Sequence, residues 1–348
     1  MSTATATQQW LFPISALEAT PSACTLEKEY YDRAKGVEFL FRLGLSLQLP
    51  TSALCTAATW LHRFYMRYSL EEFPRQEVAA TCLFLATKTE ECGRKLLDVA
   101  KIYQAKIQNI ADINKIQPDS PEVDDSQKMI LATEEVLLEA LCFDFVVENP
   151  HADLVDLFDS CASEPLVQEY AWSLAHDSYR TPLCVLFPPR IIATACFVLA
   201  QRLFDGPNSP SLDARISATS PAAHLPTPPS YKPPSPDATR IVVERYGFTD
   251  VELIALADTL SILLEFYAAQ DESSFPYLSS ISSVVPPTTT TARPRLFVPL
   301  AQINAPPPQI NPQQVSDENL GRTPRSLHGD RSPEPSNALS PTIKNGIP

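Results

Sequence analysis

Glycine is scarce in this chain, with only eight in 348 residues. Loops that cradle phosphate groups depend on glycine, because their backbone must approach the ligand closely and adopt conformations that other residues avoid. The sequence contains no P-loop, no glycine-rich phosphate turn and no nucleophile elbow. These absences argue against an intrinsic catalytic activity.

Histidines and paired cysteines are also few. The histidines are His62, His151, His176, His224 and His328. His62 lies in the middle of an expected helix, where packing or hydrogen bonding is the more ordinary role for such a residue. None of the eight cysteines forms a C-x-x-C pair, so the spacing that zinc sites favour is missing. We expect reduced thiols, an intracellular compartment, and neither a metal nor another cofactor.

Long apolar runs and basic charge are lacking as well. No run reaches the ~18–20 residues that span a bilayer, and the first ten residues lack the features of a signal peptide. The net charge is −14, while residues 271–348 hold six acidic and six basic side chains. The rest of the chain therefore carries the acidic surplus, which argues against direct nucleic-acid binding. We expect neither a membrane nor a direct nucleic-acid partner.

Proline, by contrast, is abundant and unevenly placed. Of 34 prolines, nine lie in residues 205–240 and fourteen in residues 271–348. Both stretches are rich in serine or threonine and show no hydrophobic periodicity, so we expect them to be disordered. Several of their serines and threonines precede proline, either incidentally or as sites for a proline-directed kinase, among them Thr227, Ser235, Thr323, Ser332 and Ser340.

Hydrophobic periodicity in the remaining chain predicts an all-α protein with two five-helix units. The expected helices cover residues 26–47, 52–68, 77–88, 95–107 and 126–141, then 151–161, 165–179, 189–204, 241–246 and 249–270. We expect a loop over residues 109–125. The LCVLF segment after Pro182 fits a short strand on periodicity alone.

This pattern divides the chain into four parts. Residues 1–25 form an N-terminal extension, in which the apolar residues between Trp10 and Leu17 are expected to dock on the following unit. The units themselves cover residues 26–148 and 149–270, and the second contains the proline-rich insertion 205–240. Residues 271–348 form the tail. The similarity of VAATCLFLATK to IATACFVLAQR indicates an internal repeat.

The helix expected over residues 77–88 is apolar on nearly every side. Such a helix is buried on most of its surface, so it is predicted to be the centre of the first unit. One partly polar stripe remains at spacings of four, three and four residues, formed by Glu77, Thr81, Phe84 and Lys88. We expect this stripe to face something other than the core.

A second charge in apolar surroundings is Glu134. On a helical projection of residues 126–141 it falls inside the apolar arc, between Leu138 and Leu141. A carboxylate there is costly without a partner. One interpretation is an internal ion pair or a residue at the rim of the core. The other is that Glu134 and Lys88 lie side by side on a surface that another protein covers, where they can hold a C=O and an N–H of its backbone.

Several motifs occur in an order typical of one family. HRFYM, FPR, CLFLATKTEE with RKLLDV, and LLEALCFDF strongly resemble the cyclin box, and WLFPISALEATPS and PPRIIATACFVLA fit its transcriptional branch. The chain resembles cyclin K, cyclin T and the fungal beta subunits of the RNA polymerase II C-terminal-domain kinase. The resemblance covers residues 10–205 well and residues 240–270 weakly, and it implies tandem five-helix cyclin boxes.

The resemblance implies a non-catalytic nuclear regulator that binds and activates a cyclin-dependent kinase in transcription. The first box of a cyclin packs on the αC helix of the kinase, which sets the kinase glutamate against its ATP-holding lysine. Carried over, the kinase-binding residues are Lys88 and Glu134, with Phe84 and Leu138 as apolar companions. Thr87 departs from the usual alanine or glycine. The family also allows a third subunit.

Two other classes compete with this hypothesis. A general transcription factor of the TFIIB type also has tandem cyclin folds, but the acidic folded part and the missing zinc ribbon count against it. A free-standing enzyme is opposed by the lack of a catalytic constellation. A cell-cycle cyclin is the nearest rival within the class.

Overall fold

The computed structural model describes residues 7–161, 163–217, 242–243, 245–271 and 278–304. All regular secondary structure in these ranges is helical, and none of them contains a strand. The predicted all-α fold class is therefore confirmed. Within the same ranges, no helix combines the length and the apolar character that crossing a membrane requires.

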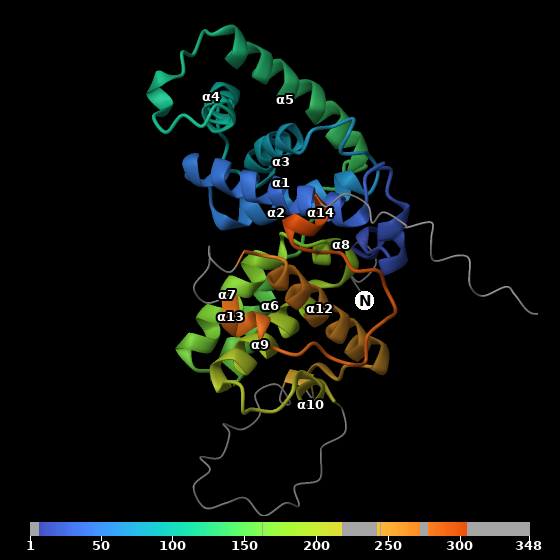
Figure 1. Ribbon diagram of the computed structural model, residues 1–348. Coiled ribbons are helices and arrows are strands. Elements are labelled where there is room, and N and C mark those ends of the chain that lie inside the picture. The colour runs from blue at the N-terminus through green and yellow to red at the C-terminus, as the bar shows by residue number, and fades with distance from the viewer. Residues whose placement is uncertain (1–6, 162, 218–241, 244, 272–277, 305–348) are drawn as a thin grey trace, which may run out of the picture. The chain divides into compact units, whose positions relative to one another are not determined.

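The first part of the chain forms five long helices, labelled in Figure 1. They are preceded by the 3-10 helices η1 (Thr7–Trp10) and η2 (Ile14–Ala19). The long helices are α1 (Leu26–Ser46), α2 (Thr51–Tyr65), α3 (Arg75–Thr89), α4 (Leu96–Ile107) and α5 (Pro121–Ala140). These bounds match the predicted helices closely, except at the start of α5.

Helix α5 begins about five residues before its predicted start, inside the expected loop 109–125. The Ser120 side chain accepts a hydrogen bond from the Val123 amide and caps the helix, and Pro121 occupies its first turn. Both residues favour a helix N-terminus at these positions. A short 3-10 helix, η3 (Ile113–Lys115), also lies within the expected loop.

Helix α3 is the centre of this bundle, as predicted. It contacts α1, α2, α4 and α5, and all side chains from Val78 to Thr87 are buried. Small residues allow this dense packing between neighbouring helices. At Gly44 on α1, an added Cβ atom would lie only 2.0 Å from the Leu54 Cδ2 atom of α2, so only glycine fits there.

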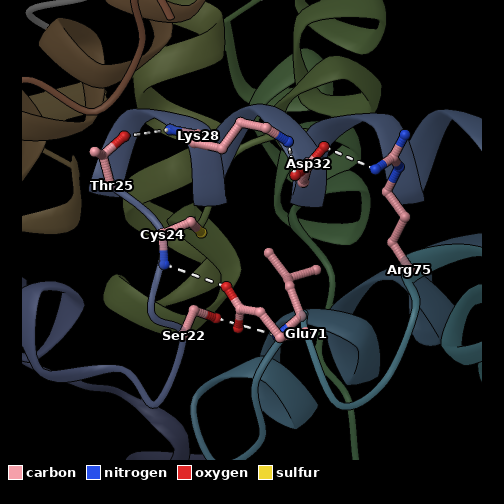
Figure 2. Close-up of polar contacts among 8 residues, drawn as sticks. Ser22, Cys24, Thr25, Lys28, Asp32, Glu71 and Arg75 are labelled. Atoms are coloured by element: carbon pink, nitrogen blue, oxygen red, sulfur yellow. Dashed lines mark hydrogen bonds and ion pairs between the residues drawn. The ribbon is translucent and has the colours of Figure 1, made fainter. Parts of the chain in front are cut away.

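Polar contacts fix the beginnings of α1 and α3 relative to each other (Figure 2). The Arg75 guanidinium at the start of α3 forms an ion pair of 2.7 Å with Asp32 on α1, and Lys28 pairs with the same carboxylate. The backbone amide of Cys24 donates to the Glu71 carboxylate at 3.2 Å. These contacts attach the start of α3, and the loop before it, to α1 and to the segment that precedes α1.

The second part of the chain is also helical. Its elements are α6 (Pro150–Cys161), α7 (Pro165–Ser178), α8 (Leu183–Leu186), α9 (Pro189–Asp205), α10 (Leu212–Ile216), α12 (Asp250–Ala268), α13 (Leu278–Ser282) and α14 (Leu300–Ile303). Residues 242–243 and 245–246 are helical too. The strand that periodicity allowed after Pro182 is wrong: the segment forms the short helix α8, which the flanking prolines confine to one turn.

Two stretches expected to be disordered contain packed residues. Within the insertion, α10 buries Leu212 and Ile216, and its Arg215 pairs with Asp205 at 2.6 Å. Beyond Asp271, α13 and α14 flank an extended segment, residues 283–299, which we call the C-terminal strap. Residues 218–241 and 305–348, with the five Ser/Thr-Pro sites named above, lie outside the described residues.

The C-terminal strap packs along α12. Arg293 forms an ion pair of 2.9 Å with Glu265, and Thr291 donates from its amide and hydroxyl to Asp258 at 2.8 and 2.6 Å. Leu296 and Phe297 are buried in the core beneath. Individual contacts, rather than a repeating pattern, hold this segment.

The buried apolar side chains form two cores. The first core lies between residues 37 and 141 and includes Tyr179 from the later part of the chain. The second core lies between residues 154 and 297 and includes Leu17 and Tyr30. Leu17, Tyr30 and Tyr179 therefore tie the two cores together.

The N-terminal segment was predicted to dock on the first unit. Trp10 does so against Arg63. Leu17, in contrast, packs in the second core, and the Phe12 amide donates to the Val185 carbonyl oxygen.

Candidate partner-binding site

The predicted stripe on α3 is mostly covered. Thr81 and Phe84 are buried, and only the ends of the stripe, Glu77 and Lys88, reach solvent. The Thr81 hydroxyl donates to the Glu77 carbonyl oxygen at 2.9 Å within the helix. The open part of this face is thus the last turn of α3, around Lys88.

Lys88 and Glu134 lie side by side on neighbouring helices. The Lys88 Nζ atom is 2.5 Å from Glu134 Oε1, and the two side chains are 45% and 11% exposed. The contact is an ion pair but not a hydrogen bond, because its geometry leaves the buried Oε1 atom without a hydrogen-bond donor. The Lys88 ammonium also lies 4.4 Å from the centre of the Phe84 ring, which stabilises the cation further.

Leu138 and Leu131 extend this site along α5. Leu138, four residues after Glu134, is half-buried against the first core. Leu131, three residues before Glu134, is 50% exposed and was not among the predicted site residues. Residues three and four apart are neighbours on a helix surface. The sequence signal for Leu131 is that spacing: a large apolar residue one turn from a charge already singled out.

Two further side chains on α3 support the geometry. The hydroxyl of Thr87 donates to the Phe84 carbonyl oxygen at 2.8 Å, so the threonine before Lys88 is satisfied within its own helix. Burial raises the pKa of the Glu77 carboxyl above its ordinary value. Glu77 is thus the partly buried end of the stripe, and Lys88 is its exposed end.

The three histidines in the described part of the chain are packed among other side chains. Nε2 of the buried His62 lies 2.9 Å from the Tyr179 carbonyl oxygen, which confirms the predicted packing and hydrogen-bonding role. His151 stacks on Tyr179, and His176 stacks on Phe41; both of these aromatic partners belong to the first core. In the part of the chain that the structure describes, no cluster of three or more histidine, cysteine or acidic side chains has the arrangement of a metal site.

The fold defines a class of helical protein with two packed bundles, and the first bundle carries the charged candidate site. Comparison with known proteins shows which family it resembles. Residues 16–146 match the cyclin N-terminal domain. Cyclin pch1 of Schizosaccharomyces pombe is 42% identical over 198 residues, which cover 56% of this chain and 58% of the relative.

Two animal relatives point the same way. Cyclin-K of Danio rerio is 35% identical over 201 residues, covering 56% of this chain and 45% of the relative. Cyclin-T2 of Homo sapiens is 31% identical over 199 residues, covering 56% and 27%. Residues 16–146 therefore carry a cyclin N-terminal domain, and the chain is similar to cyclin K and cyclin T. It spans between 27% and 58% of the length of these curated relatives.

A solved structure shares the fold. It is the crystal structure of the yeast RNA Pol II CTD kinase CTDK-1 complex, with a TM-score of 0.56, 16% identity and coverage of 84% of this chain and 86% of that chain. At this identity the likeness concerns the fold alone. It extends well beyond residue 146, so the helical arrangement of the second part is shared too.

Proposed function

We propose that this chain is a non-catalytic regulatory subunit that binds and activates a cyclin-dependent kinase acting on the C-terminal domain of RNA polymerase II. The proposal rests on similarity to cyclin pch1, cyclin K and cyclin T2 and on one observation, the Lys88–Glu134 pair. It places the chain in the nucleus, and it leaves room for a third subunit.

The chemistry of the pair suits a partner's backbone. The Lys88 ammonium has three donors and the Glu134 carboxylate only acceptors, so together they can hold a carbonyl oxygen and an amide. Phe84 beneath the ammonium and Leu138 beside Glu134 supply apolar contact. We propose that these four residues grip the kinase next to its αC helix.

Rigid placement of Lys88 is what the rest of the first core supplies. Helix α3 is buried from Val78 to Thr87, so its last turn has little freedom to move. Activation requires the kinase αC glutamate to meet the lysine that holds the ATP phosphates. A rigid contact next to αC binds the active position of that kinase helix more tightly than its inactive positions, and it therefore shifts the kinase towards the active state.

Substitution of the pair tests the proposal. Full-length chains with Lys88→Ala, Glu134→Ala or both would be expressed with an affinity tag in the source cells. The co-purified kinase would be quantified, and its activity measured on a C-terminal-repeat peptide. We expect binding to fall about 30-fold or more, since truncating one partner of an interfacial charge pair costs 2–5 kcal/mol.

The control is Glu135→Ala, an exposed neighbour on the same turn of α5. The unbound variants should remain folded, because an ion pair this exposed on the lysine side contributes only ~0.2–1 kcal/mol. Circular dichroism would establish that. If the double variant still supported full kinase activity, the proposed site would be wrong. If no kinase co-purified with the wild-type chain, the proposed function would be wrong.

A further inference from the structure

A groove of about 550 Å³ lies on the second part of the chain, far in sequence from Lys88. One wall comes from α7, and the other comes from the end of α12 and from α13. Its apolar lining is formed mainly by Leu166, Tyr170, Leu174, Leu203 and Ile281. We call this feature the α7–α13 groove. Its volume is in the range of ligand-binding pockets.

The groove is open to solvent along its apolar wall. Leu166 is 42% exposed, and Tyr170 and Ile281 are half-buried. At the bottom, Leu174 and Leu278 belong to the second core, so the floor is fixed. Apolar side chains around a firm concave floor are typical of binding surfaces.

The charge at the rim is acidic. Glu169 is exposed and has no ion-pair partner among the described residues. Asp177 accepts a hydrogen bond of 2.9 Å from the Tyr267 hydroxyl and lies 3.9 Å from Arg180. Arg180 is shared with Glu38, at 3.4 Å. Among the described lining residues the only cation, Arg180, is therefore already balanced by carboxylates, whereas Glu169 is not paired with a cation there.

We propose that the α7–α13 groove is a docking site for a peptide segment of a partner protein that carries a lysine or arginine beside large apolar residues. Apolar side chains of the segment fill the α7–α13 groove between Leu166 and Ile281. The lysine or arginine of the segment pairs with Glu169. The serine hydroxyls of Ser173 and Ser280, which also line the groove, offer hydrogen bonds to the peptide backbone.

The charge distribution selects this occupant over others. An acidic peptide would bring its carboxylates against Glu169 and Asp177 without a free cation to receive them. Repulsion between like charges disfavours such partners. A wholly apolar segment would remove water from around the Glu169 carboxylate without providing a partner for it, which costs free energy.

The test is an unbiased selection. A random library of twelve-residue peptides would be displayed on phage and selected against the full chain, with counter-selection against an Ile281→Asp variant. We expect the enriched peptides to contain lysine or arginine within a few positions of leucine or phenylalanine. Their affinity, measured by fluorescence anisotropy, should fall about tenfold with Glu169→Lys and with Leu166→Asp, and should weaken as salt is raised.

Two matched controls separate this site from others. Val251→Asp places the same charge on an exposed apolar position of α12 away from the groove, and Asp159→Asn neutralises an exposed acid on α6. Both should bind the peptides unchanged. Enrichment of acidic peptides, or of none that depend on Leu166 or Glu169, would overturn the proposal. Lys88→Ala should also bind them normally, so failure here is distinguishable from failure of the proposed kinase contact.

Discussion

At the scale of single residues, the Lys88–Glu134 pair contributes little to folding. A pair in which one side chain is nearly half exposed stabilises a protein by ~0.2–1 kcal/mol. The Glu134 side chain, in contrast, is only 11% exposed and needs a partner. Its burial is therefore hard to explain by stability alone. A carboxylate already stripped of most of its water loses little more when a partner protein covers it, which suits Glu134 to an interface.

His151 makes folding stability depend on pH. Its ring lies edge-on to the Trp172 ring, with the ring centres 4.5 Å apart, and its Nε2 is buried without a hydrogen-bond partner. Burial, with a smaller contribution from His176, lowers the pKa of His151 to about 4. The neutral ring is thus favoured in the folded state. Its stabilisation is complete above the unfolded pKa near 6.5 and is lost as pH falls from there towards 4.

Substitution of this ring should remove part of the acid sensitivity. We expect His151→Phe to keep the aromatic packing and to lose less stability than the wild type between pH 6.5 and 4, by on the order of 1–3 kcal/mol. Urea unfolding at several pH values measures the difference. His62, whose pKa burial lowers to about 3, remains in both proteins and keeps its contribution. Parallel stability curves for the two proteins would contradict the assignment.

The sequence predicted the charged residues of the site better than its apolar surroundings. Helical periodicity placed Glu134 inward, because a projection counts angles and Glu134 falls among leucines. The polar stripe predicted on residues 77–88, in contrast, gave no hint that Thr81 is covered. Periodicity identifies the direction of a side chain, whereas burial depends on where the neighbouring helices lie.

At the scale of elements, the C-terminal strap completes the second core. Phe297 is buried with its ring edge-on to Phe266 at 5.3 Å and to Tyr30 of α1 at 6.2 Å. Helix α12, in turn, carries two acids in apolar surroundings, Asp258 and Glu265. Both receive their partners from the strap. Helix and strap are thus mutually dependent.

Truncation of the strap's main anchor should destabilise the protein strongly. We expect Phe297→Ala to cost about 3–5 kcal/mol, since it removes a large buried ring from a packed core. Val285→Ala is the control: Val285 lies in the same segment but is 74% exposed, and such substitutions usually change stability by less than about 0.5 kcal/mol. Thermal unfolding followed by circular dichroism measures both. Equal stability of the two variants would mean that the strap is only loosely attached.

The sequence could predict the long helices but not the strap. Helix bounds follow from caps, prolines and periodicity, all of which are local. The strap has no period, and its attachment depends on separate contacts with residues about 30 positions away. The sequence did contain one signal for the strap, and it lay in α12. Asp258 and Glu265 are acids in a very apolar helix, and buried acids require partners.

At the scale of the whole described chain, the two cores share elements. Helix α1 contributes Tyr30 to the second core and Val37 and Leu40 to the first. Tyr179 follows α7 and joins the first core, and its carbonyl oxygen contacts the buried His62. The predicted boundary at residue 148 follows the chain, but these side chains cross it. Separate unfolding of either bundle would expose the aromatic rings of Tyr30 or Tyr179 and leave the His62 ring without its partner.

The described part of the chain should therefore unfold in one cooperative step. In a Trp172→Phe background the remaining tryptophans are Trp10 and Trp60, both buried against the first bundle. Their fluorescence then reports that bundle alone. Adding Phe297→Ala, which acts in the second core, should lower the melting temperature seen by fluorescence and by circular dichroism equally, by roughly 2–4 °C per kcal/mol. If fluorescence kept its original midpoint while circular dichroism split into two steps, the bundles would be independent, and the shared α1 would not couple them.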